Sequence, residues 1–142
     1  MRHLDWELLV ERHVSVLLVE DEVLIRMMIS DMLAELGHRV IAEAGSIDEA
    51  LPIAASAEFE LAILDVNLNG AKITPVAGVI KARNLPIIFA TGYGFAGLPE
   101  DFTNYPALQK PFQVEALAKA IDEVWKHSET ELALWRQRPR ID

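Results

Sequence analysis

The feature that most constrains the fold of this chain is a regular alternation between short apolar runs and longer segments with helical periodicity. Five runs rich in Val, Ile, Leu, Phe and Ala are typical of buried strands, at residues 14–19, 39–43, 59–66, 85–90 and 107–109. The centre of the third run is apolar at every position, as expected when both faces of a strand are buried. The alternation predicts an α/β domain with a single doubly wound, five-stranded parallel sheet covered by helices on both faces.

Local signals bound the first two predicted helices. A stripe at helical spacing predicts a helix that ends near residue 36, before Gly37, and it consists of Ile25, Met28, Ile29, Met32, Leu33 and Leu36. Ser46 and Glu49 have the spacing of a capping box, which opens a second helix. Pro52 removes an internal hydrogen bond at a cost of about 3 kcal/mol, so this helix is either kinked or begins later than Ser46 indicates.

The remaining helical segments differ in strength. Thr74 and Pro75 have the pattern of an N-cap followed by proline at the first helical position. Three glycines and two prolines between residues 92 and 106 predict a short or poorly formed helix in which mobility concentrates. The last helix is predicted from Val114, Leu117, Ala118, Ile121, Val124 and Trp125.

The length of 142 residues fits one domain with short extensions, without a fused output module of ordinary size. We expect an N-terminal extension at 1–13, the domain at 14–128, and a helical C-terminal extension at 129–142. Both extensions carry apolar residues, among them Trp6 and Trp135. Two interpretations stay open: the extensions pack on the domain or lengthen its last helix, or they form a surface for a homodimer or another partner.

The charge balance excludes several classes of function. The chain has 13 Lys and Arg against 22 Asp and Glu, a formal charge of −9, which argues against nucleic-acid binding. No apolar stretch approaches the roughly 18 residues of a membrane span, and the polar start is not typical of a signal peptide, so we expect a cytoplasmic protein without a membrane partner. Because cysteine is absent, any chemistry must rest on oxygen and nitrogen groups.

Polar residues follow four of the predicted strands at the point where each strand ends. Glu20 and Asp21 follow the first, Asp65 the third, Thr91 the fourth and Lys110 the fifth. Each feature alone has a structural explanation, since acids complement the start of a helix, aspartate begins turns, and threonine and lysine are common at strand exits and surfaces. Ligands of open parallel sheets bind beyond the carboxyl ends of the strands. Because all of these residues fall at that edge, the sequence favours a functional site there.

Electrostatics indicates what such a site would bind. Two like charges about 4 Å apart repel by roughly 4 kcal/mol at an effective dielectric of 20, so three carboxylates in one crevice favour a divalent cation. A small number of oxygen ligands is typical of Mg²⁺, which shares its shell with phosphate oxygens. We expect Asp65 to attack phosphorus and form an aspartyl phosphate, while Lys110 and the Thr91 hydroxyl each contact one phosphoryl oxygen.

Residues 14 to about 127 resemble the receiver domain of two-component response regulators. The resemblance rests on the acidic pair Glu20-Asp21, on Asp65 at the end of an apolar strand, on Thr91 before a small residue, and on Lys110-Pro111-Phe112. It implies a flavodoxin-like receiver fold with strand order 2-1-3-4-5 and a cis peptide between Lys110 and Pro111. It also implies a magnesium site formed by Glu20, Asp21, Asp65 and the backbone of Asn67, with phosphoryl contacts from Lys110 and Thr91.

The segment Phe89-Ala-Thr-Gly-Tyr93 resembles that of a subgroup of mostly stand-alone receivers. Two departures from the common receiver pattern agree with this subgroup. The loop after Asp65 lacks the usual Met-Pro stretch, and Ala107 stands where an aromatic residue usually turns inward on activation. We therefore hypothesise that Tyr93 takes part in the switch.

The resemblance implies a single-domain response regulator that acts as a phosphoacceptor switch rather than as an enzyme. A histidine kinase or a histidine phosphotransfer domain would donate the phosphoryl group, and a downstream protein would receive the signal through a conformational change or through phosphotransfer. Two alternatives differ from this. A phosphorylation-independent interaction module with a receiver fold predicts the loss of a site residue. A phosphohydrolase similar to the haloacid dehalogenase group needs an aspartate as general acid two positions after the nucleophile, where Asn67 stands.

Overall fold

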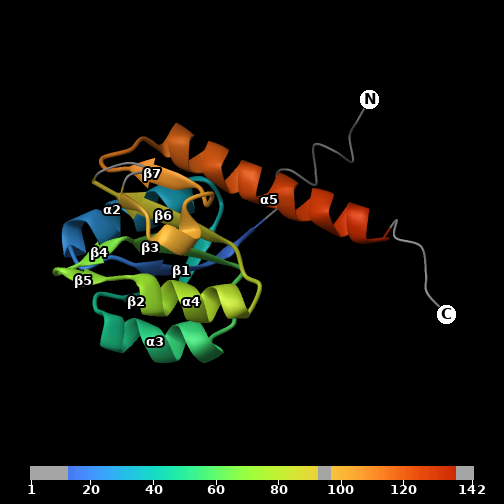
Figure 1. Cartoon of the computed structure of the whole chain (residues 1–142). Coiled ribbons are helices and arrows are strands. Elements are labelled where there is room, and N and C mark those ends of the chain that lie inside the picture. Colours follow the sequence, from blue (N-terminus) through green and yellow to red (C-terminus); the bar gives the residue numbers. More distant parts are fainter. Residues whose placement is uncertain (1–12, 93–96, 137–142) are drawn as a thin grey trace.

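The computed structural model describes residues 13–92 and 97–136. At its centre is a five-stranded parallel sheet in the order β2-β1-β3-β6-β7 (Figure 1). The strands are β1 (Ser15–Val19), β2 (Arg39–Ala44), β3 (Leu61–Asp65), β6 (Ile87–Thr91) and β7 (Ala107–Gln109). Counted along the chain, these parallel strands have the order 2-1-3-4-5, so the predicted doubly wound, flavodoxin-like fold is confirmed.

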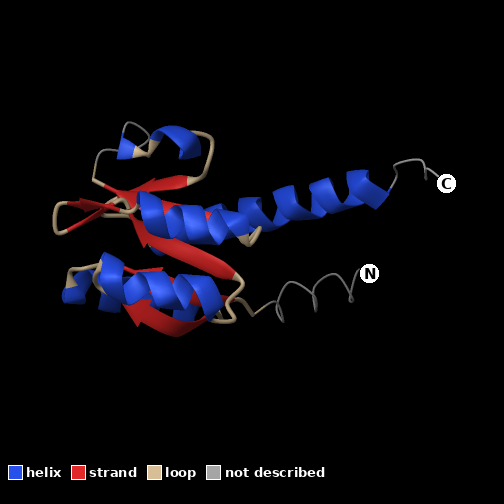
Figure 2. Ribbon diagram, turned by 60° about the horizontal axis from the view of Figure 1, so that its bottom comes forward, coloured by secondary structure: helices blue, strands red, loops and turns tan. Residues whose placement is uncertain are grey.

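Helices cover both faces of the sheet (Figure 2). One face packs against α2 (Val23–Glu35) and α5 (Val114–Arg136), and the other packs against α3 (Ile47–Ser56) and α4 (Thr74–Ala82). Successive residues of β3 alternate between the two cores, and every residue of this strand is buried. Because a fully buried Leu or Ile contributes roughly 1.5–3 kcal/mol, this central strand anchors the edge at which Asp65 lies.

The end of α2 follows the prediction. Gly37 has a positive φ of +89°, which an L side chain adopts only with strain. The N–H of His38 donates to Leu33 O at 2.8 Å and the N–H of Gly37 donates to Ala34 O at 3.0 Å. These two bonds form the Schellman arrangement that ends a helix. The chain then turns directly into β2.

The start of α3 confirms Ser46 as the predicted cap, and Glu49 bonds back to the residue before it. The Ser46 hydroxyl oxygen accepts a hydrogen bond from the N–H of Glu49 at 3.2 Å, and Glu49 Oε1 accepts one from the N–H of Gly45 at 2.8 Å. The helix begins at Ile47 and includes Pro52, so the alternative of a later start is wrong. Pro52 is the sixth residue of this helix, so the hydrogen bond that an N–H there would donate to Asp48 O is missing, while the Ser46 cap holds the first turn upstream of it. A kink at Pro52 stays a prediction.

The start of α4 corrects the prediction by one residue. The N-cap is Ile73 rather than Thr74, and Pro75 occupies the second helical position rather than the first. Ile73 is fully buried, and its carbonyl accepts the first helical hydrogen bond from Ala77 at 3.0 Å. Core packing of an apolar side chain therefore fixes the start of this helix. Proline is tolerated there because the N–H groups of the first turn have no partner within the helix.

Two short elements flank the sheet edge. The segment after β6 contains a 3₁₀ helix, η2 (Glu100–Phe102), which confirms the predicted short helix. Residues 93–96, and with them the predicted switch residue Tyr93, lie outside the described residues. After β3, an unpredicted hairpin joins β4 (Asn67–Leu68) to β5 (Ala71–Lys72). Its turn residues Asn69 and Gly70 both have positive φ, as Asn-Gly hairpin turns require.

The last helix tests the expectation that the C-terminal extension is helical. Helix α5 continues to Arg136 and projects beyond the sheet, so residues 129–136 prolong it (Figure 1). The N-terminal residues 1–12 lie outside the described part of the chain.

Met28, which the predicted apolar stripe of α2 included, is 53% exposed because it lies on the flank of the stripe. In the described residues, no helix combines the length and the apolar character that crossing a membrane requires.

Candidate functional site

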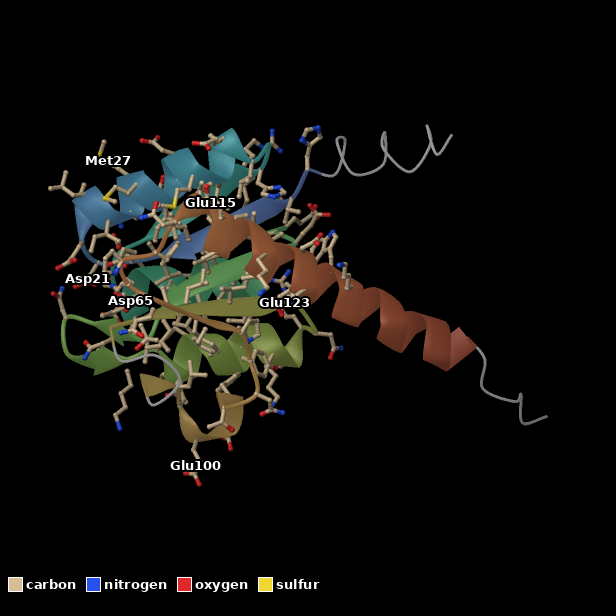
Figure 3. The ribbon with its side chains drawn as sticks, turned by 90° about the horizontal axis from the view of Figure 1, so that it is seen from above. Asp21, Met27, Asp65, Glu100, Glu115 and Glu123 are labelled. Carbon is tan, nitrogen blue, oxygen red and sulfur yellow. The ribbon has the colours of Figure 1, made fainter. Side chains whose placement is uncertain are left out.

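The sheet brings the predicted site residues to one edge. Figure 3, seen from above, shows Asp21 and Asp65 close together at one end of the molecule. Glu20 follows β1, Asp65 ends β3 and Thr91 ends β6, and these three are the buried polar or charged residues among residues 13–92 and 97–126, whose burial the structure describes. The prediction that the strand ends gather these side chains holds for all of them, because parallel pairing of adjacent strands aligns their carboxyl ends.

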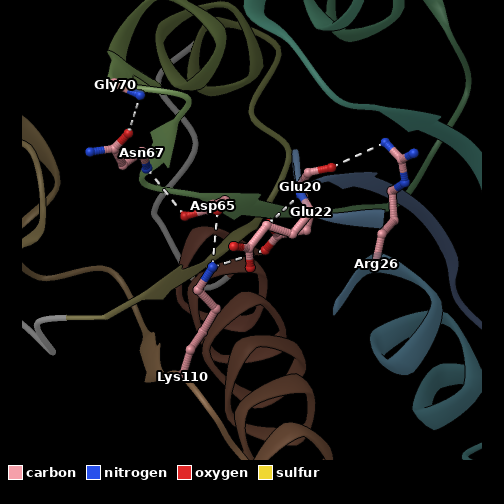
Figure 4. A network of polar contacts seen from close by, with 7 residues as sticks. All are labelled: Glu20, Glu22, Arg26, Asp65, Asn67, Gly70 and Lys110. Atoms are coloured by element: carbon pink, nitrogen blue, oxygen red, sulfur yellow. Dashed lines mark hydrogen bonds and ion pairs between the residues drawn. The ribbon is translucent and has the colours of Figure 1, made fainter. Parts of the chain in front are cut away.

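Lys110 is the cationic centre of the site. Its Nζ donates to Asp65 Oδ2 and to Glu20 Oε1, both at 3.0 Å (Figure 4). The peptide between Lys110 and Pro111 is cis, as the resemblance implied, and the N–H of Lys110 donates to Thr91 O at 2.8 Å. The lysine backbone is therefore tied to the end of β6 while its side chain reaches across to the ends of β1 and β3.

Backbone N–H groups hold the other oxygens of the two buried carboxylates. The N–H of Asn67 donates to Asp65 Oδ1 at 3.2 Å, and the N–H of Glu22 donates to Glu20 Oε2 at 3.0 Å. Both carboxylates are thus held at each end, by a backbone group and by Lys110. Neither side chain is free to rotate without losing a hydrogen bond, which keeps the two acids preorganised.

Burial sets the protonation behaviour of this network. Loss of hydration raises the pKa of the Glu20 carboxyl above its ordinary value, although the N–H of Glu22 and the ammonium of Lys110 oppose the shift. Burial by itself would lower the pKa of Lys110, but its hydrogen bonds to Asp65 and Glu20 outweigh this effect and raise it. Lys110 therefore stays protonated at neutral pH and compensates part of the negative charge.

The acids of this edge fit a divalent cation. One carboxylate oxygen from each of Glu20, Asp21 and Asp65 lies within 4.8 Å of the others. Three carboxylates against one ammonium leave an excess of negative charge in a mostly buried place. The donors are all oxygens, which is the ligand type that Mg²⁺ prefers. The residues present therefore fit a bound Mg²⁺.

A cleft of about 600 Å³ opens beside these acids. Asp65 and Thr91 line its inner end, while Lys72, Thr74 and Glu100 are among the residues that line the remainder. The cleft gives a small anionic group access to Asp65 from solvent. Its walls come from the β4–β5 hairpin, the start of α4 and the η2 region.

Two features of the site were not predicted from the sequence. The first is the Asn67–Lys72 hairpin, although its Asn-Gly pair is a strong hairpin signal. The second is Arg26 of α2, whose guanidinium donates to the carbonyl oxygen of Glu20 at 3.1 Å (Figure 4). The sequence places Arg26 in the first turns of a helix, but nothing in its spacing indicates a bond back to the preceding loop.

Residues 16–122 match the family model of the response regulator receiver domain. The chain belongs to this family. It is 36% identical over 119 residues to the response regulator protein FleR of Pseudomonas aeruginosa, and 34% identical over 111 residues to the transcriptional regulatory protein PdtaR of Mycobacterium tuberculosis. These matches cover 80% and 75% of this chain but only 24% and 54% of the two relatives, so the receiver corresponds to part of each longer protein.

A solved receiver of similar length also matches. The solution structure of SdrG from Sphingomonas melonis Fr1 has a TM-score of 0.72 and 39% sequence identity, and the match covers 79% of this chain and 96% of SdrG. A second structure describes SdrG in a BeF3-activated conformation, with a TM-score of 0.66 and 40% identity. The receiver domain therefore accounts for most of the described chain, both in sequence and in fold.

Proposed function

We propose that this chain is a receiver that accepts a phosphoryl group on Asp65 from a phosphohistidine donor in the presence of Mg²⁺, and that it passes the signal to a protein partner in the cytoplasm. The observation that carries the proposal is the shared hydrogen bonding of Lys110 to Asp65 and Glu20 at 3.0 Å. Such a lysine keeps two buried acids in place and brings a positive charge to the position that a phosphoryl group would approach.

The proposed transfer is a displacement at phosphorus. A carboxylate oxygen of Asp65 forms a bond to phosphorus while the N–P bond of the donor breaks, and the electron pair of that bond returns to the imidazole nitrogen. Lys110 then exchanges a carboxylate oxygen for a phosphoryl oxygen, and the Thr91 hydroxyl donates to another. Hydrolysis reverses the state, since attack of water on phosphorus releases inorganic phosphate and restores the Asp65 carboxylate.

The acids would hold the metal that this reaction needs. Glu20, Asp21, Asp65 and the backbone carbonyl of Asn67 are the proposed ligands. When bound, Mg²⁺ supplies neutralisation of the negative charge on the phosphoryl oxygens. The proximity of the three carboxylates supports this assignment. Their mutual repulsion is the reason that a divalent cation stabilises the arrangement.

Phosphorylation would change the region that follows β6. About two negative charges are added at the inner end of the cleft, and Thr91 is drawn toward them. Thr91 is 2% exposed and its carbonyl accepts from Lys110, so a shift of this residue displaces β7 as well. The region around η2, β7 and α5 is therefore the proposed output surface.

An apolar face beside the site supports a protein as the donor. Among residues 13–92 and 97–126, whose burial the structure describes, the large exposed apolar residues all lie on α2, and they are Val23, Leu24, Met27 and Met28. Figure 3 shows Met27 on the outer side of this helix, on the same side of the molecule as Asp21. A donor that covers this face removes apolar surface from water while its phosphohistidine reaches Asp65.

The proposal is tested by incubating the protein with Mg²⁺ and acetyl phosphate and then measuring its intact mass. Wild-type protein gains one phosphoryl group, and Asp65→Asn gains none. Asp31→Asn is the matched control, because Asp31 is an exposed aspartate on α2 and should be phosphorylated like wild type. Failure of wild type to gain mass, or an equal gain in Asp65→Asn, contradicts the proposal. Sustained turnover of a phosphomonoester would favour the phosphohydrolase instead.

A further inference from the structure

Arg26 joins two elements that are distant in the sequence. Its NH1 group donates to the carbonyl oxygen of Glu20 at 3.1 Å, and its Nε lies 3.2 Å from Glu43 Oε1 at the end of β2 (Figure 4 shows the first of these contacts). The Arg26 side chain is 20% exposed and the Glu43 side chain 47% exposed, so the arginine is mostly covered while its carboxylate partner stays partly in water. The planar guanidinium serves both acceptors at once, through separate N–H groups.

The contact reaches the peptide that links the two adjacent acids of the site. Because the carbonyl of Glu20 belongs to the peptide bond that leads into Asp21, its direction fixes the plane of that peptide. The N–H of Glu20 is held separately by Ala44 O at 3.0 Å. Arg26 thus completes the fixation of Glu20 at its carbonyl end, and the orientation of the Asp21 backbone follows from it.

Gly45 provides the space that this arrangement uses. A Cβ atom on Gly45 would lie 3.0 Å from Arg26 NH1 and 3.8 Å from the carbonyl oxygen of Glu20. The first distance is too short for an ordinary contact, so a side chain at this position would push the guanidinium away. The glycine that follows β2 therefore gives Arg26 close access to the loop after β1.

We propose that Arg26 is a positioning residue for divalent-cation binding, acting through the backbone of Glu20 and Asp21. The inference rests on the proposed metal site. Mg²⁺ requires nearly ideal octahedral geometry, so a rotated peptide that displaces the Asp21 carboxylate weakens binding. Arg26 does not touch the cation or the phosphoryl group, and its effect is transmitted by the hydrogen bond to Glu20 O.

The direction in which Mg²⁺ affinity changes on removal of Arg26 distinguishes a positioning role from a purely electrostatic one. A nearby guanidinium repels a divalent cation, so removal of Arg26 as a mere charge would strengthen Mg²⁺ binding. Removal of a positioning group weakens binding instead. Loss of residues that orient metal ligands typically lowers metal affinity by about 10- to 100-fold, and a backbone-mediated effect belongs at the lower end of that range.

The test is calorimetric titration of Mg²⁺ into the full chain, together with the amide shifts of Asp21 and Glu22. Arg26→Met should raise the dissociation constant about tenfold. Arg26→Lys should raise it as well, because an ammonium keeps the charge but lacks the planar fork. Gly45→Ala should also raise it, by less than Arg26→Met, with all site side chains retained. Arg39→Met is the control, since Arg39 is an exposed arginine at the opposite end of β2 and should bind Mg²⁺ like wild type.

Thermal unfolding in the presence of a chelator shows whether each variant is folded. If Arg26→Met does not fold, Gly45→Ala still tests the role of Arg26. A dissociation constant in Arg26→Met that equals or falls below that of wild type overturns the role of Arg26. If wild type itself does not bind Mg²⁺, the proposed metal site fails, and this inference fails with it. Weaker binding in all three site variants, with unchanged binding in Arg39→Met, supports it.

Discussion

Lys110 Nζ donates a hydrogen bond to Asp65 Oδ2 at 3.0 Å, joining residues that are 45 positions apart in the sequence. The same nitrogen bonds to Glu20 Oε1 at 3.0 Å, so one ammonium is shared by two buried carboxylates. Without a metal ion, this lysine is the cation in direct contact with these two acids. It therefore stabilises the fold and, by the same charge, opposes the entry of a second cation.

Replacement of Lys110 by methionine tests this double role. The two buried acids lose their cationic partner, and removal of one member of a buried ion pair typically costs about 3–5 kcal/mol of unfolding free energy. Mg²⁺ should restore stability in the variant, and its addition should raise the unfolding temperature of Lys110→Met more than that of wild type. Thermal unfolding with Mg²⁺ and with chelator measures both effects. Lys119→Met, at an exposed position of α5, is the control, and equal Mg²⁺ responses in all three proteins would contradict the argument.

Replacement of Glu20 should raise the stability of the fold, whereas replacement of Lys110 should lower it. Burial raises the pKa of Glu20 above the ordinary value of 4.5, so the stability that it contributes is present below that pH and is lost as the pH rises through the folded-state value. Glu20→Gln removes the charge and keeps one acceptor oxygen, which can serve either Lys110 or the N–H of Glu22 but not both positions. In chelator at pH 7 it should unfold at a higher temperature than wild type, while losing Mg²⁺ binding. Glu22→Gln, an exposed neighbour, should change neither property, and a lower unfolding temperature for Glu20→Gln would refute the assignment.

Features of the fold and the site that neighbouring residues determine could be predicted from the sequence, whereas features that long-range contacts determine could not. Strand runs with both faces buried, such as Leu61–Asp65, and caps such as Ser46 and Gly37 are encoded by neighbouring residues, and they were predicted correctly. The site followed from one topological rule, because the carboxyl ends of parallel strands meet at one edge. Glu20, Asp65 and Lys110 could therefore be brought together without any knowledge of distances.

The features that were missed depend on contacts between distant segments. Ile73 replaces Thr74 as the cap of α4 because its side chain is buried in the core, and a capping preference carries no information about that burial. Arg26 bonds to the carbonyl of Glu20 only because Glu43 and Gly45, on another element, orient its side chain and leave room for it. Such contacts need coordinates, since helical spacing alone indicates only that Arg26 is on the same side of α2 as the buried Ile29 and Leu33.

Thr91 connects the site to the rest of the sheet, and its hydroxyl can be tested separately from its volume. Thr91→Val keeps the shape of a residue that is 2% exposed but cannot donate to a phosphoryl oxygen. Asp65 should still be phosphorylated by acetyl phosphate in this variant. The amide shift changes that follow phosphorylation should be confined to the loop after β3 and should not extend to β7. Thr91→Ser retains the hydroxyl and should behave like wild type, so spread of the changes to β7 in Thr91→Val would contradict the proposed coupling.

A pH dependence arises at the opposite end of the sheet, where the N–H of Val14 donates to His38 Nδ1 at 3.2 Å. Burial, and then the charge of the nearby His13, lower the pKa of His38 below its ordinary value of 6.5. A base whose folded-state pKa is lowered contributes stability above the unfolded-state pKa, and this contribution is lost as the pH falls below 6.5 toward the folded-state value. Protonation also removes the acceptor of the Val14 hydrogen bond, which is worth about 1 kcal/mol.

His38→Asn should remove this dependence while keeping the strand in place. The asparagine side chain offers an oxygen near the position of Nδ1 but does not titrate. Urea unfolding at a series of pH values from 7.5 down to about 5.5 should show wild type losing stability below its unfolded-state pKa, whereas His38→Asn should lose less over the same interval. His13→Asn is a second test variant: it removes the charge that helps to lower the pKa of His38, and its effect should be smaller than that of His38→Asn because burial is the larger cause. Identical slopes for wild type and His38→Asn would show that protonation of His38 does not couple to the Val14 hydrogen bond at the start of β1.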